Sequence, residues 1–176
     1  ASAYATFAND GVAVPDHVVR EVRDRKGRIV YQAQPEKQRA IDEDIAHDVT
    51  YALSKVVEQG TGRAVQTLER PVAGKTGTKD RKNPDGTSDI VSAWFVAYTK
   101  QISTAVMYVA GNDGNGDLDK YARPGDSTFF GGTYPALTWA SYMKTATKGQ
   151  AIKGFPGPAY VNRDELPKSD QTMQET

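Results

Sequence analysis

Residues 91–110 read Val-Ser-Ala-Trp-Phe-Val-Ala-Tyr-Thr-Lys-Gln-Ile-Ser-Thr-Ala-Val-Met-Tyr-Val-Ala, which is two apolar runs joined by a short polar turn. The runs cover residues 91–98 and 102–110, and each has the length of a β-strand. Both are mainly apolar on both faces, whereas a strand with one solvated face alternates apolar with polar residues. This stretch therefore predicts a central antiparallel pair of strands, with helices covering each side of the sheet.

Helical patterns lie on both sides of this pair in the sequence. The clearest covers residues 43–59, where Asp42 is a candidate cap, acidic residues fill the first turn, and Gly60 can end the helix. Residues 134–146 predict a closing helix, and residues 1–9 predict the end of another helix that stops at Gly11. In the 43–59 helix, apolar residues recur with helical spacing and predict one stripe, made of Ile45, Val49, Leu53, Val56 and Val57.

The segments between these elements are polar and rich in turn residues, so they predict connections at the surface. They are a hairpin over 18–32, a linker over 33–39, a charged turn region over 79–89 with its tip at 83–86, and a long loop over 111–126.

The composition excludes several classes of function. The chain has 22 Lys and Arg against 22 Asp and Glu, so no net charge favours nucleic acid or an anionic membrane. It has no cysteine, which excludes a thiolate nucleophile, a disulfide and a cysteine-based zinc site. No run approaches the about 20 apolar residues that span a bilayer.

We expect the chain to be part of a longer polypeptide. It opens with Ala-Ser-Ala-Tyr-Ala-Thr-Phe-Ala, which has neither an initiating Met nor a basic leader and is typical of the middle of a helix. Only 38% of its residues are hydrophobic, which fits either long polar loops or a core that other segments complete. We expect residues 1–147 to form one unit and residues 148–176 to form an extended, increasingly disordered tail.

Residues 73–78 read Ala-Gly-Lys-Thr-Gly-Thr and carry the most specific candidate chemistry. Acyl transfer through a serine requires a base or positive charge near the nucleophile, N–H donors for the oxyanion and a way to hold the substrate. Lys75 can supply the charge, and the hydroxyls of Thr76 and Thr78 can bind a carboxylate. Gly77 lets a substrate backbone lie close to the strand, and the N–H of Thr78 can face an oxyanion. Lys-Thr-Gly also recurs by chance in ordinary turns, so the motif alone is weak.

Six segments, in one order, resemble the transpeptidase domain of class A penicillin-binding proteins. The resemblance implies an α/β (α+β) fold of the β-lactamase/transpeptidase type, a five-stranded antiparallel sheet flanked by helices on both faces. This chain would supply the C-terminal part, with the last three strands and the closing helix. The segments are Tyr4-Ala-Thr-Phe-Ala-Asn-Asp-Gly11, Val56-Val-Glu-Gln-Gly-Thr-Gly62, Val72-Ala-Gly-Lys-Thr-Gly-Thr78, Ala93-Trp-Phe-Val-Ala-Tyr-Thr99, Ser103-Thr-Ala-Val106, and Gly131-Gly132 followed by Pro135-Ala136 and Trp139.

The resemblance also implies roles for individual residues. Lys75 would be the electrostatic lysine, Thr76 and Thr78 would contact the terminal carboxylate of the substrate or of a β-lactam, and the Thr78 N–H would be half of the oxyanion hole. The enzyme would be a serine D,D-transpeptidase that cross-links peptidoglycan stem peptides through an acyl-enzyme, without a cofactor or metal. It would act at the extracytoplasmic face of the bacterial cell membrane, anchored by a segment absent from this chain.

The nucleophile of such an enzyme is missing from the sequence. The family's Ser-x-x-Lys and Ser-x-Asn elements should precede Lys75, and nothing there matches either. The remainder of the domain would therefore come from a separate chain or from missing sequence, and the isolated chain would be inactive. Two alternatives stay open: a non-catalytic docking module or pseudo-enzyme fragment, and a D,D-carboxypeptidase or β-lactamase in which water is the acceptor.

Three further patterns are weaker candidates. Ser141-Tyr-Met-Lys144 matches Ser-x-x-Lys, but it lies downstream of Lys75 on a predicted helix, where a solvated surface explains it. Tyr160-Val-Asn162 is similar to a Tyr-x-Asn variant of the second element, but it lies in the proline-bearing tail. Asp113-Gly-Asn-Gly-Asp117 suggests calcium, yet the glycine and glutamate of an EF-hand loop would fall on Leu118 and Pro124. A solvated turn is the better interpretation.

Overall fold

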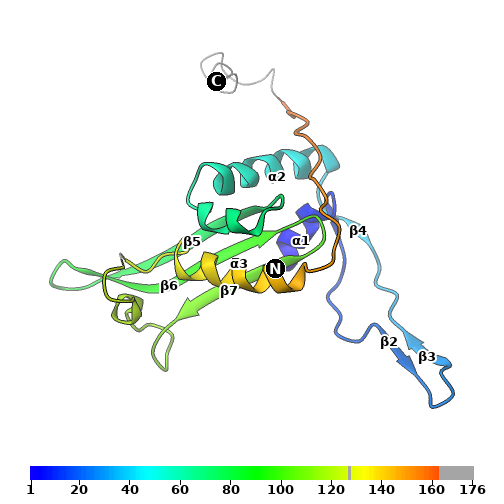
Figure 1. Ribbon diagram of the computed structural model, residues 1–176, viewed down its shortest axis with the longest axis horizontal. Coiled ribbons are helices and arrows are strands. Elements are labelled where there is room, and N and C mark those ends of the chain that lie inside the picture. The colour runs from blue at the N-terminus through cyan, green and yellow to red at the C-terminus, as the bar shows by residue number, and fades with distance from the viewer. Residues whose placement is uncertain (127, 163–176) are drawn as a thin grey trace.

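The computed structural model describes residues 1–126 and 128–162 (Figure 1). These residues form a three-stranded sheet with helices around it, and two small two-stranded sheets beside it. In chain order the elements are α1 (Ser2–Ala8), β1 (Val12–Ala13), β2 (Glu21–Arg23), β3 (Ile29–Gln32), β4 (Gln38–Arg39), α2 (Glu43–Glu58), the 3₁₀ helix η1 (Arg63–Leu68), β5 (Ala73–Lys82), β6 (Ser88–Tyr98), β7 (Ser103–Val109), the 3₁₀ helix η2 (Leu118–Tyr121) and α3 (Tyr134–Ala146).

The main sheet has the strand order β5-β6-β7, and both pairs are antiparallel. This confirms the three strands and the antiparallel pairing of β6 with β7. Of the predicted pair only β6 is central: within the described residues β7 is an edge strand, and it exposes one face, on which Met107 and Val109 lie. The β5–β6 hairpin is longer than the sequence predicted, because Asp80, Arg81 and Lys82 pair with β6 instead of forming a turn. An ion pair between Arg81 and Asp89, with N and O atoms 2.7 Å apart, joins directly opposed residues of the two strands, so charges that suggested a loop support the hairpin.

The two faces of β6 are covered by different helices. Phe95 packs edge-on against Trp139 of α3, with ring centroids 5.7 Å apart, and belongs to the main core. Tyr98 points to the opposite face, since its position differs by an odd number of residues, and it meets Tyr4 of α1 at 6.1 Å. Helices on both faces were predicted from the resemblance, and these contacts confirm the arrangement.

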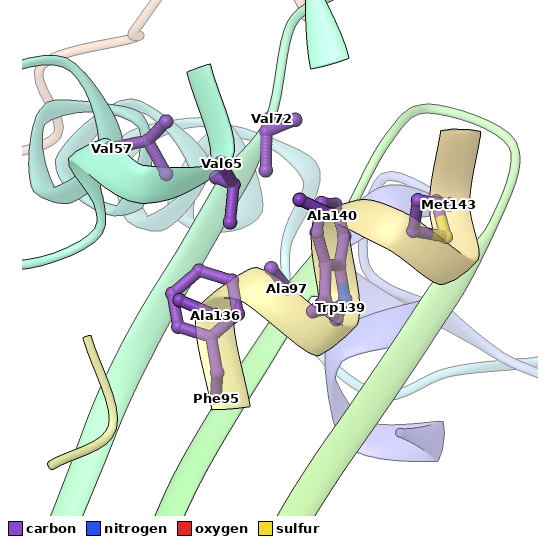
Figure 2. Close-up of a cluster of buried hydrophobic side chains, with 9 residues drawn as sticks. All are labelled: Val57, Val65, Val72, Phe95, Ala97, Ala136, Trp139, Ala140 and Met143. Carbon is purple, nitrogen blue, oxygen red and sulfur yellow. The ribbon is translucent and has the colours of Figure 1, made fainter. Parts of the chain in front are cut away.

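The main core joins α2, η1, β6 and α3. Figure 2 shows its side chains converging between the α3 helix and the sheet. Trp139 is fully buried, and its indole N–H donates a hydrogen bond to the carbonyl of Thr104, so the ring is packed without an unsatisfied polar atom. The buried members of this core are Val57, Val65, Val72, Phe95, Ala97, Ala136, Trp139, Ala140 and Met143.

Helix α2 buries only part of the predicted stripe: Val57 is buried, its neighbours at 49, 53 and 56 are partly buried, and Ile45 is exposed. Ala46, Thr50 and Val57 are its buried residues, whereas Ile45 is 41% exposed. The prediction missed Thr50 because it counted only apolar residues. Thr50 is polar but can be buried, since its hydroxyl is hydrogen-bonded to that of Tyr98 at 2.8 Å. Burial raises the pKa of Tyr98 to about 12 although this hydrogen bond lowers it, so the phenol stays neutral. Asp42 occupies the predicted N-cap position, but its side chain makes no capping hydrogen bond.

The segment between α1 and α2 contains one more pair of strands than the predicted hairpin and linker. Helix α1 ends at Ala8, and Gly11 follows with φ of 83° and donates its N–H to the carbonyl of Thr6. Within the predicted linker, β4 pairs with β1, which the sequence did not indicate because both strands have only two residues. The predicted hairpin is present as β2 and β3, and it projects away from the main sheet (Figure 1).

Residues 148–162 contain no helix or strand, but they run back along α2. The carboxylate of Asp48 accepts backbone N–H bonds from Ala159, Tyr160 and Val161 at 2.7, 2.8 and 2.8 Å. Phe155 meets the ring of Tyr98 edge-on at 5.5 Å. The rest of the predicted tail, residues 163–176, lies outside the described residues.

Candidate functional site

Strand β5 divides the side chains of the Lys-Thr-Gly-Thr segment between the two faces of the sheet. Thr76 pairs with Phe95 and Thr78 with Ala93, which belong to the buried α3 side. Lys75 is exposed and lies on the opposite face. The side chains of the two threonines therefore start from one face of the sheet and that of Lys75 from the other.

The hydroxyl of Thr76 is contacted by two neighbouring groups. The Oγ1 atom of Thr61, in the turn after α2, lies 2.8 Å from Thr76 Oγ1. Lys75 bends back over its own strand, where Nζ donates to the Thr76 carbonyl at 3.0 Å and to Thr76 Oγ1 at 3.4 Å. The three groups form one connected polar cluster on β5.

The hydroxyl of Thr78 is held by the loop that precedes α3. The backbone N–H of Gly131 donates to Thr78 Oγ1 at 3.2 Å. This approach requires glycine, because a Cβ at Gly131 would lie 2.1 Å from the Trp94 carbonyl oxygen and 2.8 Å from that of Gly77. The loop therefore lies directly on the β5–β6 pair beside the two threonines.

Thr61 and Gly131 were not recognised as site residues from the sequence. They stood only inside the Gly60-Thr-Gly62 and Gly131-Gly132 segments that carried the resemblance. The glycines in these two segments could have indicated them, since glycine allows two backbones to approach closely. Spacing along the chain does not reveal that both segments meet β5.

The other edge of β5 is open. Within residues 1–126 and 128–162, β6 is the only strand that pairs with β5, so backbone groups on the opposite edge have no strand partner. Such an edge can accept an extended peptide as an additional strand. The threonine hydroxyls and Lys75 lie along this same strand.

The weaker candidates lie away from this cluster or have structural partners. Ser141 and Lys144 are exposed on α3, as expected for a solvated surface. The Tyr160–Asn162 segment lies against α2, where Asp48 accepts the N–H of Tyr160. Asp113 accepts the N–H of Asn115, and this bond lowers the pKa of the Asp113 carboxyl. In the part of the chain that is described, no three His, Cys, Asp or Glu side chains are grouped so that they could hold a metal ion.

An antiparallel sheet with helices on both faces and a Lys-Thr-Gly-Thr segment on its edge strand is the arrangement of the β-lactamase/transpeptidase fold class. A profile of the penicillin-binding protein transpeptidase domain matches residues 1–127. The chain belongs to the penicillin-binding protein transpeptidase domain family.

The curated relatives of this chain include penicillin-binding proteins 1A, which are class A penicillin-binding proteins. Penicillin-binding protein 1A of Neisseria gonorrhoeae is 36% identical over 167 residues, which cover 92% of this chain and 19% of that protein. Penicillin-binding protein 1A of Mycolicibacterium smegmatis is 33% identical over 164 residues, covering 92% of this chain and 20% of that protein. The chain thus spans about a fifth of the length of these curated relatives.

Solved structures of the same class share the fold. The penicillin-binding protein PonA1 from Mycobacterium tuberculosis aligns with a TM-score of 0.73 and 30% identity, over 90% of this chain and 40% of that one. The PonA1 protein has also been solved in complex with penicillin V. Penicillin-binding protein 1A from Haemophilus influenzae aligns with a TM-score of 0.68 at 21% identity over 90% of this chain and 27% of that one, which supports the fold alone.

Proposed function

We propose that this chain supplies the substrate-side wall of a serine D,D-transpeptidase that cross-links peptidoglycan stem peptides. The observation that carries the proposal is β5, an open-edged strand with Lys75 and two threonine hydroxyls along it. The similarity to PonA1, a protein solved with penicillin V, supports recognition of β-lactams at the equivalent strand.

In the proposed reaction, a serine from outside this chain attacks the carbonyl carbon of the D-Ala-D-Ala peptide bond. The C–N bond breaks, the terminal D-Ala leaves with a proton on its amine, and an acyl-enzyme remains. An amine of a neighbouring stem peptide then attacks this ester and releases the serine. The Thr76 and Thr78 hydroxyls would hold the terminal carboxylate, while the Thr78 N–H would stabilise the oxyanion.

Lys75 would contribute positive charge beside the nucleophile. Its exposed ammonium lies over its own strand and contacts Thr76, so only a side-chain rotation separates it from a ligand bound along β5. The Ser-x-x-Lys and Ser-x-Asn elements would come from the remainder of the domain, either in a separate chain or in sequence outside these 176 residues.

We further propose that residues 1–147 form one unit and that the enzyme acts at the extracytoplasmic face of the bacterial membrane. No helix within the described residues is both long and apolar enough to cross a bilayer.

Covalent labelling with a fluorescent penicillin tests the proposal. The protein that includes the Ser-x-x-Lys element should be labelled, and the 176-residue chain alone should stay unlabelled. Lys75→Met should slow labelling by about 10²-fold or more, the size of effect of losing one group that stabilises developing charge. Lys82→Met, at the far end of the same strand, is the matched control and should label at the wild-type rate.

Each contrary outcome has a definite meaning. Label on Ser141 in the isolated chain would overturn the assignment of the nucleophile to another segment. Stable association of this chain with the remaining segments, without labelling, would favour a docking module or pseudo-enzyme. If the labelled enzyme releases the acyl group to water and never to an amine, it is a carboxypeptidase or β-lactamase.

A further inference from the structure

We propose that Thr61 is a positioning residue that makes the β5 hydroxyls selective for an anionic carboxylate. This inference rests on the proposed function of the same strand. It concerns the direction in which the Thr76 and Thr78 hydroxyls point their protons, which decides whether they donate to a ligand or accept from it.

The hydroxyl of Thr78 has a fixed hydrogen-bonding role, as an acceptor from the protein and a donor to a ligand. A hydroxyl can donate one hydrogen bond and accept two. The Gly131 N–H can only donate, so the Thr78 Oγ1 atom accepts this bond at 3.2 Å. The hydroxyl of Thr78 can then donate a hydrogen bond to a ligand, and an anionic carboxylate oxygen is the strongest acceptor for such a bond.

The hydroxyl of Thr76 can take the same role, accepting from Thr61 and donating to a ligand. Lys75 Nζ, which has no acceptor capacity, is 3.4 Å from Thr76 Oγ1. Thr61 Oγ1 is 2.8 Å from the same atom, and either hydroxyl can be the donor of that bond. When a carboxylate accepts the Thr76 proton, the Thr61 proton turns to Thr76. A chain of hydrogen bonds then runs from Thr61 through Thr76 to the ligand, each bond strengthening the next.

The Thr61 turn is held rigidly enough for this role although Thr61 itself is exposed. The N–H of Gly62 donates to the Val56 carbonyl at 2.9 Å, which ties the turn to the end of α2. On its other side the turn meets the loop before α3, because a Cβ at Gly132 would lie 2.5 Å from the Thr61 carbonyl oxygen and 3.7 Å from Thr76 Cγ2. Contacts on both sides preorganise the hydroxyl.

The two contacts act on threonines that share one face of β5, so the carboxylate would meet two donors from neighbouring sites. A neutral ester in its place cannot accept as strongly from a hydroxyl. The Thr61 hydroxyl should therefore speed acylation by a ligand with a free carboxylate and have little effect on acylation by the corresponding ester. A residue that only maintained the fold would affect both ligands equally.

The test measures acylation rate constants of the protein that includes the Ser-x-x-Lys element, with benzylpenicillin and with its methyl ester. Thr61→Val, which keeps the shape and removes the hydroxyl, should slow acylation by benzylpenicillin about tenfold, the effect of one lost hydrogen bond. Acylation by the ester should stay within about twofold. Thr61→Ser should restore the preference for the carboxylate. Thr67→Val, an exposed threonine of η1, is the matched control and should change neither rate.

The outcomes separate this inference from the function on which it rests. If the wild-type protein is not acylated by benzylpenicillin, the proposed function fails, and the role of Thr61 fails with it. If the wild type is acylated but Thr61→Val keeps the full preference for the carboxylate, only the role of Thr61 is wrong. Equal slowing with both ligands would likewise overturn it, since that is the result of a structural defect.

Discussion

Replacing each of the two glycines of the Ala-Gly-Lys-Thr-Gly-Thr segment with alanine should change the stability of the fold by very different amounts. Gly74 lies directly opposite Ala97 in the β5–β6 pair. A Cβ at Gly74 would be 2.4 Å from the Ala97 Cβ and 2.9 Å from the Val96 carbonyl oxygen. Opposed Cβ atoms in antiparallel sheets are normally about 4.5–5.5 Å apart, so Gly74→Ala forces the strands to separate at a fully buried position.

Gly77, three residues further along the strand, has more room. The nearest atom to a Cβ there is the Trp94 Cβ at 3.3 Å. Trp94 is 38% exposed and can move outward. Replacing glycine with alanine also reduces the conformational entropy of the unfolded chain, which stabilises by about 0.4–1 kcal/mol where the backbone is compatible. We therefore expect Gly77→Ala to change the free energy of unfolding by less than about 1 kcal/mol.

For Gly74→Ala, overpacking of the core should cost about 1–3 kcal/mol. In a domain of this size each kcal/mol lowers the Tm by about 2–4 °C. Thermal unfolding followed by circular dichroism would measure both variants. Gly154→Ala is the control, because a Cβ there meets nothing within 4 Å.

Equal stability of Gly74→Ala and Gly77→Ala would refute the close approach of β5 and β6 at Ala97. A second readout separates fold from function. Under the proposed function, Gly77→Ala should slow acylation by penicillin while the protein stays folded, since the added methyl group narrows the space beside the bound ligand. A stable Gly77→Ala protein with wild-type acylation would show that the ligand does not need this glycine.

Three further predictions concern the core, an ion cluster and the C-terminal segment. Trp139→Ala should cost about 3–5 kcal/mol in urea unfolding because the ring is fully buried, and a cost below about 1 kcal/mol would contradict the core of Figure 2. Burial raises the pKa of Asp10, but hydrogen bonds from Lys100 and His47 outweigh it and lower the pKa below its ordinary value. This carboxylate therefore stabilises the fold above about pH 4, and the contribution is lost as the pH falls through the lowered pKa. Asp10→Asn, which tolerates the φ of 54°, should cost about 1 kcal/mol at pH 7 and progressively less as the pH falls below about 4, and a cost that does not change with pH would be inconsistent with this origin. Asp48→Asn should speed amide hydrogen exchange at residues 159–161, which Asp48 binds, and unchanged exchange there would show that these bonds do not hold the segment.

Much of the architecture followed from local patterns. The apolar runs at 91–98 and 102–110 predicted the strands β6 and β7. The burial that these runs implied holds for β6, whereas β7 exposes one of its faces within the described residues. The helix at 43–59 followed from its spacing of apolar residues and its terminal glycine. The same reasoning found only part of the buried face of α2: Val57 is buried as predicted, but Thr50 was missed, because its hydroxyl is hydrogen-bonded to a tyrosine 48 residues away.

The errors have a common physical cause. The charged residues 79–82 read as a turn, yet they form a strand because Asp89 lies across from Arg81. Strands β1 and β4 are too short to show a period of two, and only their pairing defines them. In each case the stabilising partner is distant in sequence, so no local pattern contains the information.

The sequence by itself determined the family, the three strands of the main sheet and the Lys-Thr-Gly-Thr segment, because each depends on residue types at fixed spacing. The tertiary structure alone decided which groups surround that segment. Thr61 and Gly131 are 15 and 53 residues from Thr76 and Thr78, respectively, and reach them only because the turn after α2 and the loop before α3 fold onto β5. A hydrogen bond depends on distance and direction in space, which the order of residues does not express.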